Sequence, residues 1–173
     1  MCEKLREIPG AEVVECDAQT LPFGDEEFDV VIASHMLYHL DDPQQALNEF
    51  ARVLKQGGKV FISLGAKESG KETIALMEKI GRPSIIVQTT RITAETAPVY
   101  LGKAGFGEVE GERYLGDLEV PIVEPVLAYL RSLVEGLSEE QEAMTRKVVE
   151  EKIGEEGCFR VTKEVVLFKA RKD

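Results

Sequence analysis

The segment from Phe28 to Leu64 constrains the fold more than any other, because it carries the pattern of a strand, a helix and a second strand. FDVVIAS (28–34) is apolar without alternation, which predicts a strand covered on both faces, as in a parallel sheet. A second buried strand is predicted at KVFISL (59–64). The helix between them supplies the right-handed crossover that parallel strands need. Residues 28–64 are therefore predicted to form one βαβ unit.

The crossover helix has clear start and stop signals. Asp42 is placed to cap its N-terminus, Pro43 occupies the first helical position, and Gln45 completes a pattern like a capping box. Gly57-Gly58 is predicted to end it through a left-handed cap. One face of the helix is apolar, and the opposite face, predicted to be solvated, carries Gln44, Asn48, Glu49, Arg52 and Lys55.

The sequence outside 28–64 predicts further helices and strands. It contains no repeat and no linker that would divide residues 1–173. The order of these elements indicates a single α/β domain. Pro83 to Arg91 has no clear pattern. The predicted strands are 11–16 (AEVVEC), 108–115 and a terminal strand within 158–170; the predicted helices are 2–8, 71–80, 93–104 (capped by Thr93), 125–134 and 139–153.

Charge and cysteine content narrow the classes of partner. The chain has 32 acidic and 21 basic side chains and a formal net charge of −11. This balance argues against nucleic acid and against an anionic membrane surface, both of which select basic faces. No apolar run approaches the ~20 residues of a membrane span. Three unclustered cysteines predict a reducing, cytoplasmic setting.

Ligands of an open parallel sheet bind beyond the carboxyl ends of its strands. Two such ends are visible: Cys16-Asp17-Ala18, which leads into an LPF loop, and Ser34-His35-Met36, which leads to Tyr38 and His39. These two segments hold the candidate site residues.

At these residues the sequence resembles a known family. The stretch 14–63 reads VECDAQTLPFGDEEFDVVIASHMLYHLDDPQQALNEFARVLKQGGKVFIS. It resembles the class I S-adenosylmethionine-dependent methyltransferases, and most of all their small-molecule branch, which includes quinone-biosynthesis C-methyltransferases. The Asp-Ala pair, the LPF loop, the Phe-Asp-x-Val strand, the Arg-Val-Leu-Lys helix end and the Gly-Gly turn occur in the family's order. The resemblance implies a Rossmann-like sheet and transfer of a methyl group from S-adenosylmethionine to a small molecule.

The resemblance also implies roles for the site residues. Asp17 would accept a hydrogen bond from the adenine amine, Ala18 would contact the ring, and Leu21 with Phe23 would form an apolar wall. Ser34 would face the methionine part of the cofactor. The substrate side would be lined by His35, Met36, Tyr38 and His39, and a helical lid at 118–157 would exclude water.

Two features of the family are absent from these 173 residues. There is no GxGxxG turn, and no acidic residue ends a second strand to hold the ribose hydroxyls. The resemblance begins inside the helix that follows the second strand. We therefore expect an N-terminally truncated sheet that lacks its first βαβ unit, with Met1 an internal methionine of a longer gene or the chain a fragment. The edge of strand 28–34 would be unpaired, which gives a reason for self-association.

Other interpretations of the same residues remain open. His35 and His39 are four apart, but with only Cys16 nearby as a third ligand the sequence predicts packing or hydrogen bonding, not a metal site. A general base could come from either histidine or from Tyr38. The chain could also be a non-catalytic remnant that acts as a binding or dimerisation module. A nucleotide-dependent oxidoreductase is less favoured, because it needs the same GxGxxG turn.

Overall fold

The computed structural model describes residues 6–82, 91–134 and 136–173, which form a four-stranded mixed sheet and six helical segments. The strand order is β1-β2-β4-β3. β1 and β2 are parallel, and β4 is antiparallel to both of its neighbours. The strands are β1 (Phe28–Ser34), β2 (Leu54–Gly65), β3 (Phe106–Val120) and β4 (Phe159–Lys172).

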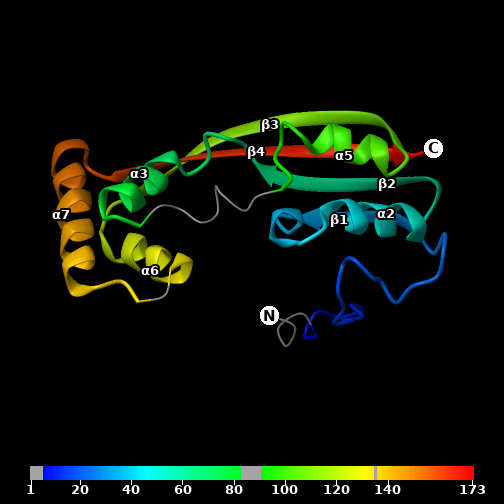
Figure 1. Cartoon of the computed structure of the whole chain (residues 1–173), viewed down its shortest axis with the longest axis horizontal. Helices are drawn as coiled ribbons and strands as arrows, with labels where there is room; N and C mark the ends of the chain where they lie inside the picture. Colours follow the sequence, from blue (N-terminus) through cyan, green and yellow to red (C-terminus); the bar gives the residue numbers. More distant parts are fainter. Residues whose placement is uncertain (1–5, 83–90, 135) are drawn as a thin grey trace.

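The helices fall into two groups, which Figure 1 shows at the two ends of a long ribbon made by β3 and β4. We call the sheet with η1, α2 and α5 the sheet lobe, and the group formed by α3, α6 and α7 the helical lobe. The segments are η1 (Leu37–His39), α2 (Pro43–Val53), α3 (Lys71–Lys79), α5 (Ala97–Lys103), α6 (Glu124–Leu133) and α7 (Glu139–Glu156). None of the described helices is long and apolar enough to cross a membrane.

The βαβ unit predicted at 28–64 is confirmed. The Asp42 carboxylate accepts a hydrogen bond from the Gln45 amide at 3.0 Å, so the N-terminus of α2 is capped as expected. The predicted end is wrong, because α2 stops at Val53 and Leu54 already begins β2. Gly57, with φ +75°, and Gly58 lie inside β2, at a bulge opposite Asp29. A Cβ on Gly58 would lie 2.8 Å from the Lys55 carbonyl oxygen, so glycine is required there.

Each lobe has its own apolar core. In the sheet lobe, α2 and α5 pack one face of the sheet, with Leu47 and Leu101 fully buried against Val60, Ile62 and Phe168. In the helical lobe, α3, α6 and α7 enclose a second cluster that includes Leu76, Leu130, Val149 and Phe159. Because Phe159 begins β4 and Phe168 lies near its end, one strand contributes to both cores.

The opposite face of the sheet is open. Val30 is 47% exposed and Ile32 is 74% exposed, so the prediction that strand 28–34 is covered on both faces is wrong. Their neighbours Val31 and Ala33 point to the covered face and pair with Val60 and Ile62. In the described chain no helix packs on the Val30 and Ile32 side, since α2 and α5 both belong to the other face.

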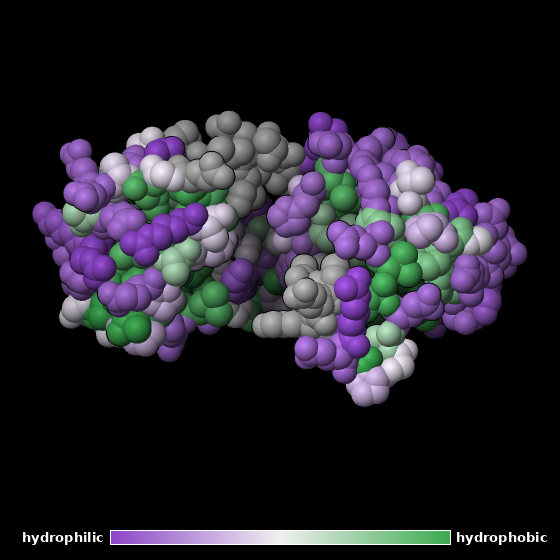
Figure 2. Space-filling model, turned by 90° about the horizontal axis from the view of Figure 1, so that it is seen from below, coloured by the Kyte–Doolittle hydropathy of each residue, from purple (hydrophilic) through white to green (hydrophobic). Residues whose placement is uncertain are grey.

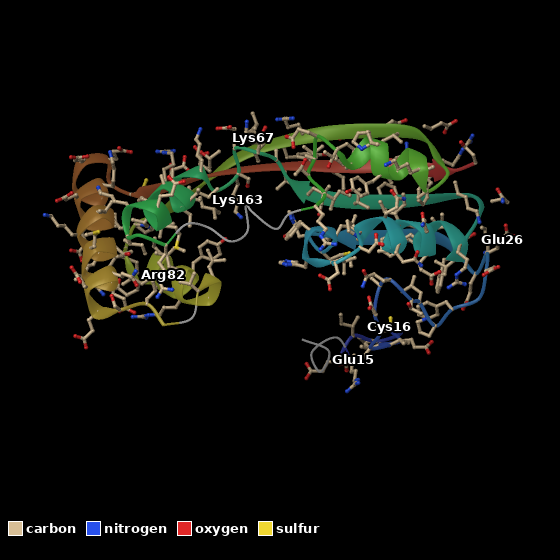
Figure 3. All side chains as sticks on the ribbon, viewed as in Figure 1. Glu15, Cys16, Glu26, Lys67, Arg82 and Lys163 are labelled. Atoms are coloured by element: carbon tan, nitrogen blue, oxygen red, sulfur yellow. The ribbon has the colours of Figure 1, made fainter. Side chains whose placement is uncertain are left out.

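The strand predicted at Ala11–Cys16 is also wrong. The segment has no regular structure, and Val14 is 43% exposed. A strand needs a neighbour, and the 11 residues from Asp17 to Glu27 contain no helix that could serve as a parallel crossover to β1. Figure 3 shows Glu15 and Cys16 away from the sheet, on the side of β1.

The remaining elements agree with the sequence with shifted boundaries. α3, α6, α7 and β4 are confirmed, and β3 extends well beyond the predicted 108–115. The helix predicted from Thr93 begins at Ala97, because residues 93–96 form a turn in which the Thr96 hydroxyl accepts from the Thr93 amide at 2.9 Å. Of the predicted helix 2–8, residues 6–8 form a turn and 2–5 lie outside the described residues; so do 83–90.

Candidate functional site at the carboxyl ends of β1 and β2

The carboxyl ends of β1 and β2 are tied together by polar groups. The hydroxyls of Ser34 and Ser63 lie 3.0 Å apart. The His35 amide donates to the Ser63 carbonyl oxygen at 3.1 Å and lies 3.2 Å from its hydroxyl. Both strand ends point toward the helical lobe (Figure 1), and the molecule is hollowed between the two lobes (Figure 2). The predicted residue Ser34 therefore lies at the edge of the sheet where ligands of such folds bind.

The chain turns sharply immediately after Ser34. His35 has φ +51°, a left-handed conformation that non-glycine residues rarely adopt and that is concentrated at functional sites. The turn leads into η1, where the rings of Tyr38 and His39 lie 4.4 Å apart between centroids. The His35 and Tyr38 rings are 6.4 Å apart. The structure thus brings three of the four predicted substrate-side residues into one cluster of rings.

Tyr38 is suited to donate a hydrogen bond and is not suited to act as a base near neutral pH. Burial, and then the nearby Tyr129 of α6, raise the pKa of the Tyr38 phenol above its usual 10.0. The phenol therefore keeps its proton.

The Asp17 loop is held at the same edge by α2. The Asp17 carboxylate accepts from the Gln19 amide at 2.9 Å, and the Gln19 side-chain oxygen accepts from the Asp42 amide at 2.7 Å. Asp17 itself is exposed. Asp42 caps α2 and lies only three residues after His39. The two candidate segments, which are 16 positions apart at Ala18 and Ser34, therefore meet at the start of one helix.

Glu49 and Arg52 are the residues that the sequence analysis missed. They were assigned to the solvated face of the helix, and that assignment is wrong. The Glu49 carboxylate accepts from the Leu21 amide at 2.8 Å and from Arg52 at 2.7 Å. Arg52 in turn donates to the carbonyl oxygens of Phe23 at 2.8 Å and Leu21 at 3.1 Å. An acid and a base three residues apart were visible in the sequence, but nothing in it showed that a loop would be their partner.

Three other predicted site residues pack against the apolar core. Ala18, Leu21 and Met36 are half-buried and pack against the core of the sheet lobe, so they form the apolar backing of the edge.

No group of three or more metal-ligating side chains occurs in residues 6–82, 91–134 and 136–173. Cys16 is exposed and Cys158 is buried; both are free thiols. A cavity of about 450 Å³, lined by Leu76, Val148 and Phe159 among others, lies in the helical lobe and not at this edge.

Comparisons with known proteins match the N-terminal third of the chain, which holds most of the candidate residues. Residues 1–62 match the family model described as a methyltransferase domain. The ubiquinone/menaquinone biosynthesis C-methyltransferase UbiE of Xanthomonas oryzae pv. oryzae is 44% identical over 55 residues, which are 32% of this chain and 22% of that protein. The matched segments span only between 16% and 32% of the lengths of such curated relatives.

The fold extends the likeness to nearly the whole chain. The structure of BH2331 from Bacillus halodurans C-125 matches with a TM-score of 0.63 at 21% identity, over 93% of this chain and 77% of that one. A SAM-dependent methyltransferase from Archaeoglobus fulgidus matches with a TM-score of 0.52 at 19% identity, over 94% and 68% of the two chains. Residues 1–62 therefore resemble the methyltransferase-domain family, and the chain has the fold of the class I S-adenosylmethionine-dependent methyltransferases.

Proposed function

We propose that this chain binds S-adenosylmethionine at the carboxyl ends of β1 and β2 and transfers its methyl group to a small-molecule acceptor. The observation that carries the proposal is the convergence of the Ser34–Ser63 pair, the His35 turn and the Asp17 loop at one edge of the sheet. All of these residues except Ser63 lie within 1–62, the range that matches the methyltransferase-domain model.

The residues present fit two parts of the cofactor. The exposed Asp17 carboxylate offers an acceptor to the adenine amine, with Ala18 and Leu21 as apolar backing. The Ser34 hydroxyl and its Ser63 partner offer polar contacts to the methionine part. The described residues offer the ribose no glycine-rich turn and no acidic residue at a strand end. We therefore propose that the first βαβ unit of the family's sheet is absent from these 173 residues.

On the acceptor side we propose His35, Met36, Tyr38 and His39. When bound there, S-adenosylmethionine would supply an electrophilic methyl group to the acceptor, with S-adenosylhomocysteine as the leaving group. The protein's task is to align the acceptor and exclude water. Tyr38, which keeps its proton, positions a polar group of the acceptor by donating to it. Residues 118–157, which include α6 and α7, act as the lid.

We further propose partners and a setting. The net charge of −11 disfavours nucleic acid and anionic membranes, which leaves a small molecule as the acceptor, and the relative UbiE is named for such chemistry. Two free cysteines fit a reducing cytoplasm. Self-association would use the edge of β1, the strand that pairs with β2 alone in the described residues.

Calorimetric titration with S-adenosylhomocysteine tests cofactor binding directly, with folding checked by circular dichroism in the same buffer. We expect micromolar binding that Asp17→Ala weakens. Glu15→Ala is the matched control, because Glu15 is an exposed acid two residues away. A folded chain that produces no binding heat would refute the proposal and favour a non-catalytic binding or dimerisation module.

A further inference from the structure

The side chain of Gln19 links the Asp17 carboxylate to the start of α2. Gln19 is half-buried, and its Oε1 accepts a hydrogen bond from the Asp42 amide at 2.7 Å. Its Nε2 donates to both oxygens of the Asp17 carboxylate, at 3.3 Å to Oδ1 and 3.2 Å to Oδ2. The Gln19 carbonyl oxygen also accepts from the Gln45 side chain at 3.4 Å. One amide group therefore connects Asp17 to the residue that caps α2.

The chemistry of its two neighbours fixes how the Gln19 amide is turned. The Asp42 backbone N–H can only donate, and a carboxylate can only accept. Both are satisfied only when Oε1 faces Asp42 and Nε2 faces Asp17. A glutamate at position 19 would still accept from Asp42, but it would place a second carboxylate against Asp17. The position therefore needs a planar group that carries an acceptor and a donor.

The same residue also fixes the orientation of the Asp17 carboxylate. The Gln19 backbone amide donates to Oδ1 at 2.9 Å, so Oδ1 accepts two hydrogen bonds from residue 19. Within the described residues Oδ2 accepts one, which leaves it the greater capacity to accept from a ligand. Asp17 is exposed and thus accessible to such a donor. Held in this way, the carboxylate presents an acceptor and no donor.

We propose that Gln19 is a positioning residue that fixes the Asp17 oxygen offered to the cofactor and so selects a base with an exocyclic amine. The inference rests on the proposed function, in which Asp17 accepts from the adenine amine. A deaminated base would place a carbonyl oxygen against the carboxylate, so two acceptors would face each other without a proton between them. Gln19 acts through Asp17 and needs no contact with the cofactor.

Calorimetry with two ligands tests the selection. The ligands are S-adenosylhomocysteine and S-inosylhomocysteine, its deaminated analogue, and we expect wild type to prefer the first at least about tenfold. Gln19→Glu keeps the acceptor for Asp42 and removes only the donor to Asp17. We expect it to weaken S-adenosylhomocysteine binding about tenfold and to bring the ratio of the two affinities toward one. Gln56→Glu is the matched control, because it makes the same change at an exposed glutamine near the start of β2, away from the site.

The ratio of affinities separates positioning from a purely structural role. If Gln19→Glu weakens both ligands by the same factor, the loop is damaged without loss of selection, and the proposal is overturned. Wild-type affinities and an unchanged ratio in this variant would overturn it as well, while leaving the proposed function intact. A folded wild-type chain that binds neither ligand would refute the proposed function and this inference together. Circular dichroism checks the folding of each variant.

Asp17→Asn tests the orientation from the other side of the contact. The carbonyl oxygen of the new amide can accept from both donors of residue 19, which turns its NH₂ group to the place of Oδ2. A donor in that place matches a carbonyl of the base, so we expect this variant to prefer S-inosylhomocysteine. Equal affinities, or a continued preference for S-adenosylhomocysteine, would show that residue 19 does not fix the group and would overturn the proposal.

Discussion

Glu49 and Arg52 lie one turn apart on α2 and together fasten the loop that carries Asp17 and Leu21. The Glu49 carboxylate, 13% exposed, accepts from Arg52 and from the Leu21 amide. We expect Glu49→Gln to lower the free energy of unfolding by about 1–3 kcal/mol, since a hydrogen-bonded, mostly buried charge is lost. Urea unfolding measures this, and Glu150→Gln on the exposed face of α7 serves as control. An unchanged midpoint would contradict the role of the pair.

The same contact predicts a dependence of stability on pH. The hydrogen bond from Arg52, reinforced by that of the Leu21 amide, holds the pKa of Glu49 below its usual 4.5. The stabilisation is therefore fully present above pH 4.5 and is lost as the pH falls through the lower pKa of the folded state. We expect the difference between wild type and Glu49→Gln to shrink between pH 7 and pH 3 in urea unfolding. A constant difference over this range would show that the carboxylate's charge is not involved.

Removing the Ser34 hydroxyl should affect ligand binding and leave stability nearly unchanged. Ser34 is exposed, so we expect Ser34→Ala to change the free energy of unfolding by less than about 0.5 kcal/mol. Loss of one polar contact should weaken S-adenosylhomocysteine binding by roughly fivefold. Ser132→Ala, an exposed serine of α6, is the control for calorimetry. Equal affinities of the two variants would remove Ser34 from the cofactor site.

Because each lobe has its own apolar core, a leucine-to-alanine change in one core can be compared with the same change in the other. Leu130 and Leu47 are both fully buried, the first in the helical lobe and the second under the sheet. Each change to Ala should cost about 2–5 kcal/mol. We expect Leu130→Ala to leave the affinity for S-adenosylhomocysteine unchanged while lowering methyl-transfer rates, because the proposed lid would be loosened. A matching loss of cofactor affinity in calorimetry would show that the lid also holds the cofactor.

Local signals sufficed to predict the βαβ unit. The cap at Asp42 and Pro43 and the apolar spacing of α2 depend on residues within a few positions of one another, and the structure confirms them. The sequence also placed Ser34 and His35 at the end of a strand, and the structure confirms this. Asp17 follows no strand, and it is the contact between Gln19 and Asp42 that brings its loop to the same edge.

Features that depend on distant neighbours could not be predicted. Val30 and Ile32 read as buried because an apolar strand normally has cover on both faces, and only the arrangement of α2 and α5 shows one face open. Ala11–Cys16 has strand-like residues but no sheet edge within reach. Glu49 and Arg52 read as solvated because their partners, the backbone groups of Leu21 and Phe23, lie 28 and 29 residues away.

The position of β4 has a consequence for how the chain is made. β4, which follows β3 in the sequence, lies between β2 and β3, and β3 has no other neighbour in the described sheet. Until residues 159–172 leave the ribosome, β3 cannot join the sheet and neither core is complete. Because pairings this distant in sequence form slowly, the nascent chain exposes the apolar faces of β2 and α2 until β4 emerges. This fourteen-residue strand is therefore the element that completes both cores during folding.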